Sequence, residues 1–248
     1  MRSFLLDEGD GRSGQKDQLR LLTHERMKQE LKINLDHITL TGELSLSENA
    51  CGLIIFSHGS GSSRFSPRNN FVAQYLNKKG LATFLFDLLT REEDQDPRIR
   101  FDVGLLANRL VEVTKTLMKM ASTKDLPLAY FGASTGAASA LIAASVLQHR
   151  IKAIVSRGGR PDLALEFLKD VKAPTLLLIG EFDRQVIALN EQAYEKLPGI
   201  KSLRIIKAAS HLFEEPGTLE EVAHYSAGWF IQHLGNRKNQ PFHDYIFV

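Results

Sequence analysis

The chain has 248 residues, of which 43% are hydrophobic and 24% are charged, with a formal net charge of +2. This length accommodates one domain with a full hydrophobic core. A near-neutral charge without a long basic run argues against nucleic acid as a partner. The single cysteine, Cys51, excludes an internal disulfide framework.

The sequence has neither the pattern of a secretory signal nor that of a membrane span. Only Phe4-Leu5-Leu6 precedes the first acidic residues, which is too short for the apolar core of a secretory signal. No stretch approaches the length of a membrane span. We therefore expect a cytoplasmic protein without a membrane partner, and the sequence leaves its oligomeric state open.

Residues 1–27 are polar and lack clear periodicity, so we interpret them as an N-terminal arm. From Gln29 onward, apolar and polar residues alternate in two runs that meet at Asp36-His37. Such period-2 runs predict an antiparallel hairpin. We assign residues 28–236 to one domain and residues 237–248 to a C-terminal tail.

After Cys51, continuous apolar runs alternate with helical patterns. The runs are Leu53–Phe56, Ala82–Phe86, Leu128–Phe131, Ala153–Val155, Thr175–Ile179 and Leu203–Ile206. Together with the hairpin they predict an α/β fold, a mostly parallel eight-stranded sheet with helices on both faces. Only about 16 residues separate the sixth and seventh strands, which leaves no room for a large lid.

Two helix boundaries are marked in the sequence. Ser66-Pro67 places a capping residue before proline at the first helical position, and Gly80 predicts the end of that helix. Thr218 and Glu221 have the spacing of a capping box and predict the start of the last helix.

The segment Gly132-Ala133-Ser134-Thr135-Gly136 lies between a short buried strand and a helix of small residues. A serine between glycines at a strand-to-helix turn is typical of a nucleophile elbow. The tight turn requires small neighbours and lifts the serine Oγ clear of the backbone. We therefore predict Ser134 as a nucleophile.

A serine nucleophile needs a base, and the base needs an orienting acid. Among the downstream histidines, His211 closely follows a predicted strand and precedes a helix, so it is the predicted base. Asp183 follows the preceding strand and is the predicted acid, with Glu181 and Asp162 as alternatives. An alternative role for Asp183 is to cap the next turn.

The attacked carbonyl also needs donors for its developing negative charge. We predict the backbone N–H of Thr135 as one donor and that of Ser60 as the other, with Gly59 or Gly61 as alternatives to Ser60. The glycine-rich run 58–63 resembles a phosphate loop, but no Gly-Lys-Ser/Thr follows it. His58 is expected to fix this loop through its ring nitrogens.

These motifs together resemble the α/β-hydrolase superfamily over about residues 29–235. The compact, lidless layout resembles the dienelactone-hydrolase-like branch. The segments Ser156–Asp162 and His211–Gly217 resemble those of bacterial members, some of which are fused to phosphoribosyltransferase domains. Dienelactone hydrolases use a cysteine nucleophile where this chain has Ser134, so lactone specificity is not carried over. The resemblance implies acyl transfer to water.

Three arginines, Arg64, Arg157 and Arg160, follow parallel strands at the edge where the site should open. One hypothesis is that they bind a carboxylate or phosphate of the substrate, because guanidinium pairs with such groups bidentately. The alternative is that they tie loops to nearby carboxylates such as Asp162, Glu214 or Glu215.

Two further clusters have simpler interpretations. Asp87 and the acidic run 92–96 lack an adjacent histidine, so we expect a solvated loop and no metal. The aromatic residues Phe65, Phe101 and Phe213 either line an acyl pocket or pack in the core. No cofactor is predicted.

The sequence therefore favours a serine-dependent hydrolase that cleaves a small soluble ester, thioester or lactone through an acyl-enzyme on Ser134. We expect a small-molecule substrate, anionic if the arginines bind it. Two alternatives stay open: a non-catalytic ligand-binding or interaction module on the same fold, and an acyltransferase that uses the same triad.

Overall fold

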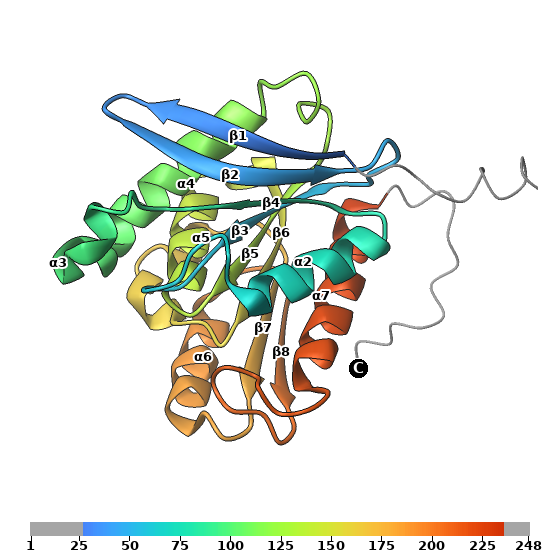
Figure 1. Ribbon diagram of the computed structural model, residues 1–248. Coiled ribbons are helices and arrows are strands. Elements are labelled where there is room, and N and C mark those ends of the chain that lie inside the picture. The colour runs from blue at the N-terminus through green and yellow to red at the C-terminus, as the bar shows by residue number, and fades with distance from the viewer. Residues whose placement is uncertain (1–26, 236–248) are drawn as a thin grey trace, which may run out of the picture.

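A computed structural model describes residues 27–235, and its eight strands form one sheet (Figure 1). The expected N-terminal arm, except Met27, and the expected C-terminal tail lie outside the described residues. The strands are β1 Met27–Leu35, β2 Ile38–Leu46, β3 Leu53–Ser57, β4 Ala82–Phe86, β5 Leu128–Ala133, β6 Ile151–Arg157, β7 Thr175–Gly180 and β8 Lys201–Ile206.

The sheet has the order β1-β2-β4-β3-β5-β6-β7-β8. β1 pairs antiparallel with β2, and β2 pairs antiparallel with β4, whereas β4, β3, β5, β6, β7 and β8 pair in parallel. The β1–β2 register pairs Leu35 with Ile38, so the hairpin turns at residues 36–37 as predicted. The predicted fold class is therefore confirmed.

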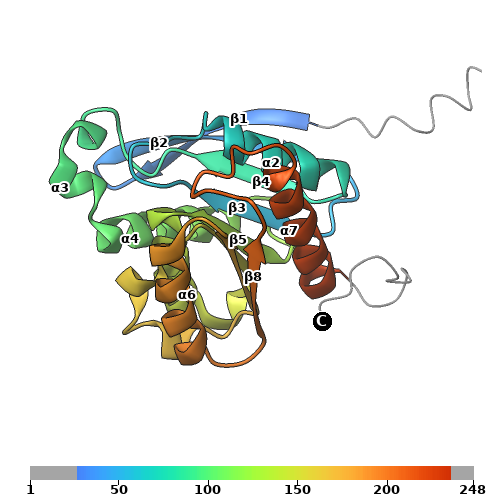
Figure 2. The same cartoon turned by 90° about the horizontal axis from the view of Figure 1, so that it is seen from below.

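Helices cover both faces of the sheet (Figure 2). One layer consists of α2 Pro67–Lys78 and α7 Thr218–Leu234, and the other of α4 Val103–Leu117, α5 Thr135–Leu147 and α6 Arg184–Lys196. The remaining helical segments are short: α3 Pro97–Arg100 and the 3-10 turns Glu93–Gln95, Gln148–Arg150, Pro161–Ala164 and Leu168–Asp170. None of the helices in residues 27–235 is both long and apolar enough to cross a bilayer.

Neighbouring residues of the buried strands point to opposite faces and supply two separate cores. On β5, Tyr130 belongs to the core under α4 and α5, and Phe131 to the core under α2 and α7. The Tyr130 hydroxyl lies 2.7 Å from Thr114 Oγ1 of α4, which satisfies its polar end within the core. This double burial explains the continuous apolar runs of the sequence.

Both predicted helix starts are confirmed, but only the first helix has the predicted cap. Ser66 caps α2, because its Oγ accepts a hydrogen bond from the Asn69 N–H at 3.3 Å. The capping box predicted at Thr218 is wrong. Thr218 is already inside α7, preceded by Gly217 at φ 84°, and its hydroxyl donates backward to the Glu215 carbonyl at 2.8 Å.

Candidate active site

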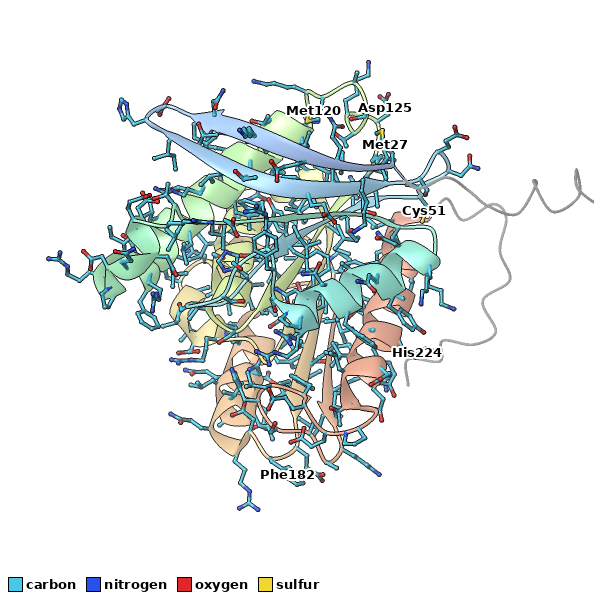
Figure 3. The ribbon with its side chains drawn as sticks, in the orientation of Figure 1. Met27, Cys51, Met120, Asp125, Phe182 and His224 are labelled. Atoms are coloured by element: carbon cyan, nitrogen blue, oxygen red, sulfur yellow. The ribbon has the colours of Figure 1, made fainter. Side chains whose placement is uncertain are left out.

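The predicted catalytic residues all follow the carboxyl ends of parallel strands. Ser134 follows β5, Asp183 follows β7, and His211 lies beyond β8. Because parallel strands end at the same edge of a sheet, these three loops open on one side of the molecule. Phe182, the neighbour of Asp183, marks this rim in Figure 3 and is 63% exposed.

The elbow at Ser134 is held by close packing on both sides. Ser134 has φ 53° and ψ −123°, a region that non-glycine residues rarely occupy. A Cβ added at Gly136 would lie 2.2 Å from the Ser57 carbonyl oxygen, and one at Gly132 would lie 2.5 Å from the Ala137 Cα. Both glycines are therefore required sterically, as the sequence argument anticipated.

His211 and Asp183 form a pair, with Nδ1 of the ring 2.5 Å from Oδ2 of the carboxylate. The Asp183 side chain is 14% exposed and that of His211 is 37% exposed. When Nδ1–H donates to the carboxylate, Nε2 of the neutral ring is left as an acceptor for a proton. The geometry therefore suits a base oriented by an acid.

The alternative acids have other partners. Glu181 accepts a hydrogen bond from the Ala208 N–H at 2.8 Å, and Asp162 is paired with Arg160. Ser134 Oγ forms no hydrogen bond with any described residue, so its bond to His211 is not made in this state. Such bonds are often long before substrate binds and shorten in the reacting complex.

The two predicted oxyanion donors lie side by side. The Ser60 N–H donates to Thr135 Oγ1 at 2.8 Å, and the two hydroxyl oxygens are 2.9 Å apart. Thr135 is the first residue of α5, so its own N–H has no acceptor within the helix. A Cβ added at Gly59 would lie 3.1 Å from the Ser134 Cβ, which places this loop directly against the elbow.

His58 fixes that loop, in agreement with its predicted role. Its Nε2 accepts a hydrogen bond from the Leu88 N–H at 3.0 Å, which requires an unprotonated Nε2. The Nδ1–H then donates to the Gly59 carbonyl, also at 3.0 Å. Burial lowers the pKa of His58 below its ordinary value and so favours this neutral ring.

The three arginines of the substrate hypothesis have different surroundings. Arg64 forms an ion pair with Asp87, and its guanidinium lies 4.2 Å from the Phe65 ring centroid. Arg160 binds Asp162 with two hydrogen bonds of 2.9 and 2.8 Å. Arg157 is 8% exposed, and its Nε and Nη1 have no hydrogen-bond partner within residues 27–235.

Sequence reasoning missed Arg68, which lies near Arg157 and adds a second positive charge. Burial, followed by this charge, lowers the pKa of Arg157 to about 10. Arg68 occupies α2, a helix distant in sequence, so only the fold reveals that the two guanidinium groups are neighbours.

The remaining clusters are the acidic and the aromatic side chains and the cysteine. Among residues 27–235 no group of histidine, cysteine and acidic side chains is arranged to hold a metal. Phe213 is buried, whereas Phe65 and Phe101 are 68% and 59% exposed. Cys51 precedes β3 and lies at the other edge of the sheet, away from Phe182 (Figure 3).

The sheet order and the two helix layers define an α/β hydrolase. A solved dienelactone hydrolase from Anabaena variabilis is 49% identical in sequence, with a TM-score of 0.83, and the match covers 85% of this chain and all (100%) of that one. The chain therefore belongs to the dienelactone-hydrolase-like family of α/β hydrolases. Est1E from Butyrivibrio proteoclasticus shares the fold at 17% identity, with a TM-score of 0.69 over 84% of this chain and 99% of its own.

A protein of Mycobacterium tuberculosis H37Rv, provisionally named a phosphoribosyl transferase, is 48% identical over 206 residues. The match covers 83% of this chain but 46% of that protein, so this chain spans about half the length of its curated relative. No protein-family model matches the chain.

Proposed function

We propose that the protein is a serine hydrolase that cleaves a small ester, thioester or lactone through an acyl-enzyme on Ser134. The observation that carries the proposal is the His211–Asp183 pair, which follows β8 and β7 at the same sheet edge as the strained Ser134 elbow. The family supports hydrolysis in general, and the arrangement of these side chains supports the serine mechanism that we propose.

In the first half-reaction, Ser134 Oγ attacks the substrate carbonyl carbon while its proton moves to His211 Nε2. Asp183 stabilises the imidazolium that forms. The tetrahedral intermediate then loses its alcohol or thiol, which takes the proton from His211. In the second half-reaction, water gives its proton to His211, attacks the acyl carbon and releases the acid, and Ser134 recovers its proton.

The oxyanion would be held by the N–H groups of Thr135 and Ser60. The Thr135 N–H lies at the N-terminus of α5, where the helix dipole favours negative charge. The Ser60 N–H is bonded to Thr135 Oγ1 in the free protein. Substrate must therefore replace this hydroxyl as the acceptor, or the neighbouring Gly59 or Gly61 amide must serve instead.

Acyl transfer to an acceptor other than water uses the same residues. The segment between β6 and β7 contains only two 3-10 turns, so no large lid there protects the acyl-enzyme from water. This arrangement favours hydrolysis. The name of the Mycobacterium tuberculosis relative refers to phosphoribosyl transfer. This chain spans only 46% of that protein, so we do not propose that activity for this chain.

The first test is labelling with a fluorophosphonate probe together with hydrolysis of short 4-nitrophenyl esters. We expect the wild type to react with both and Ser134→Ala to lose labelling, with kcat/KM lower by about 10³-fold or more, because the nucleophile is gone. A folded wild type that neither labels nor hydrolyses would support the binding-module alternative.

His211→Gln and Ser210→Ala form a matched pair on one loop. The first removes the base and is expected to reduce activity nearly as much as Ser134→Ala, and the second should change it little. An acceptor alcohol is then added to the wild-type assay. A product that is mainly the ester of this alcohol, rather than the free acid, would indicate an acyltransferase.

A further inference from the structure

The guanidinium of Arg157 is buried, and two of its nitrogens, Nε and Nη1, have no hydrogen-bond partner among the described residues. Arg157 is 8% exposed, and Arg109, on α4, is 9% exposed. Arg109 forms an ion pair with Glu93 and donates to the Leu88 carbonyl at 3.0 Å. Arg157, by contrast, has neither a carboxylate partner nor an acceptor for Nε and Nη1 among the described residues.

A second positive charge nearby makes the burial of the Arg157 charge still less favourable. Arg68 is close enough to lower the pKa of Arg157, and its own Nε is buried without a partner in the described part of the chain. Arg68 Nη1 binds Glu214 at 2.9 Å, but this carboxylate is 62% exposed and contacts Arg68 rather than Arg157. Burying an unpaired charge is strongly unfavourable, so two neighbouring guanidinium groups are suited to bind an anion between or beside them.

Arg157 also lies close to the predicted catalytic residues. Its carbonyl accepts the hydrogen bond from the Ser134 N–H at 3.1 Å. Its guanidinium lies 6.0 Å from the ring centroid of Phe213, which is two residues after His211. A Cβ added at Gly158 would lie 3.5 Å from His211 Cε1, so the residue that follows β6 packs against the predicted base.

We propose that Arg157, assisted by Arg68, binds an anionic group of the substrate, so that the preferred substrates are esters or thioesters carrying a carboxylate or a phosphate. The inference rests on the proposed hydrolase function. We assign this role to Arg157 rather than to Arg64 or Arg160, because the guanidinium groups of those two arginines are already bound to Asp87 and Asp162.

The kinetic test compares mono-4-nitrophenyl adipate, which ends in a carboxylate, with its neutral methyl ester. We expect Arg157→Gln to lower kcat/KM for the acid by about 10- to 100-fold and to change that for the methyl ester less than threefold, since a hydrogen bond to a charged group is lost. Arg157→Lys should recover part of the loss. Arg98→Gln, which removes an exposed arginine paired with Asp96, is the control.

Equal losses on both esters, or no loss on either, would overturn the inference. Thermal unfolding of each variant shows whether it is folded. A 4-nitrophenyl ester ending in a phosphonate, assayed in parallel, separates phosphate from carboxylate as the preferred anion.

A binding measurement keeps the inference testable even if the proposed hydrolysis fails. Monomethyl adipate and inorganic phosphate are titrated into Ser134→Ala, with and without Arg157→Gln. We expect at least one anion to bind and its Kd to rise about tenfold or more when Arg157 is removed. Binding of neither anion, or binding that is independent of Arg157, contradicts the proposal whatever the esterase assay shows.

Discussion

His58 shows how one residue can couple the loop beside the elbow to pH. Its ring joins the Gly59 carbonyl to the Leu88 N–H and therefore holds the loops after β3 and β4 together. Protonation of Nε2 would replace an acceptor by a donor that faces the Leu88 N–H. The buried ring thus resists protonation, and its folded-state pKa is below the ordinary value of 6.5.

This shift predicts the direction in which stability depends on pH. Below about pH 6.5 the unfolded chain binds a proton at His58 while the folded protein stays neutral there, so the free energy of unfolding falls as pH decreases. The loss is at most about 1.4 kcal/mol per pH unit for this group. Urea unfolding of the wild type and His58→Asn between pH 7.5 and 5 measures it.

His58→Asn is expected to be less stable than the wild type at pH 7.5, because both ring hydrogen bonds are lost. Its stability should nevertheless change less with pH, since the depressed group is absent. Parallel pH curves for the two proteins would show that His58 does not contribute to the dependence.

At the scale of elements, α5 approaches β3 more closely than side chains would allow. Gly136 lies in the first turn of α5 against the Ser57 carbonyl oxygen, which is main-chain and cannot turn away. Ser57 Oγ and Ser139 Oγ are 2.8 Å apart and connect the same two elements. This close approach fixes the helix N-terminus under the predicted nucleophile.

Gly136→Ala is therefore expected to lower the free energy of unfolding by about 2 kcal/mol or more, because α5 must move away from β3. Gly104→Ala is the matched control on α4. A Cβ there meets only Asp102 Oδ1, at 3.4 Å, and alanine should leave stability unchanged or raise it by up to about 1 kcal/mol. Urea unfolding of both variants tests the difference, and equal effects would contradict this account of the packing.

At the scale of the whole molecule, hydrophobic patterns were sufficient to predict the sheet. Each apolar run became a strand. The central strands are covered on both faces and leave few polar positions, as Tyr130 and Phe131 show on β5, whereas the edge strand β8 is only partly buried. The start of α7 at Thr218 was predicted correctly, but the way in which it is capped was not. Thr218 and Glu221 have the right spacing, but the chain enters the helix through Gly217, and local spacing does not determine that entry.

For the predicted site, the order of the residues along the chain could be predicted, whereas the directions of the side chains could not. The order of Ser134, Asp183 and His211 follows from the strands they succeed, and the His211–Asp183 bond agrees with that order. The burial and the carboxylate partners of the arginines depend instead on the direction that each long side chain takes. Arg157 and Arg160 are three positions apart, yet one is buried without a carboxylate and the other is bound to Asp162.

The strained backbone at Ser134 implies a conflict between stability and activity. A serine at φ 53° and ψ −123° costs about 1–3 kcal/mol that a glycine would largely avoid. Ser134→Gly should therefore unfold at a higher urea concentration than Ser134→Ala, although both lack the nucleophile. Selection for stability alone would remove the serine from this turn, so its presence there indicates selection for what its hydroxyl does.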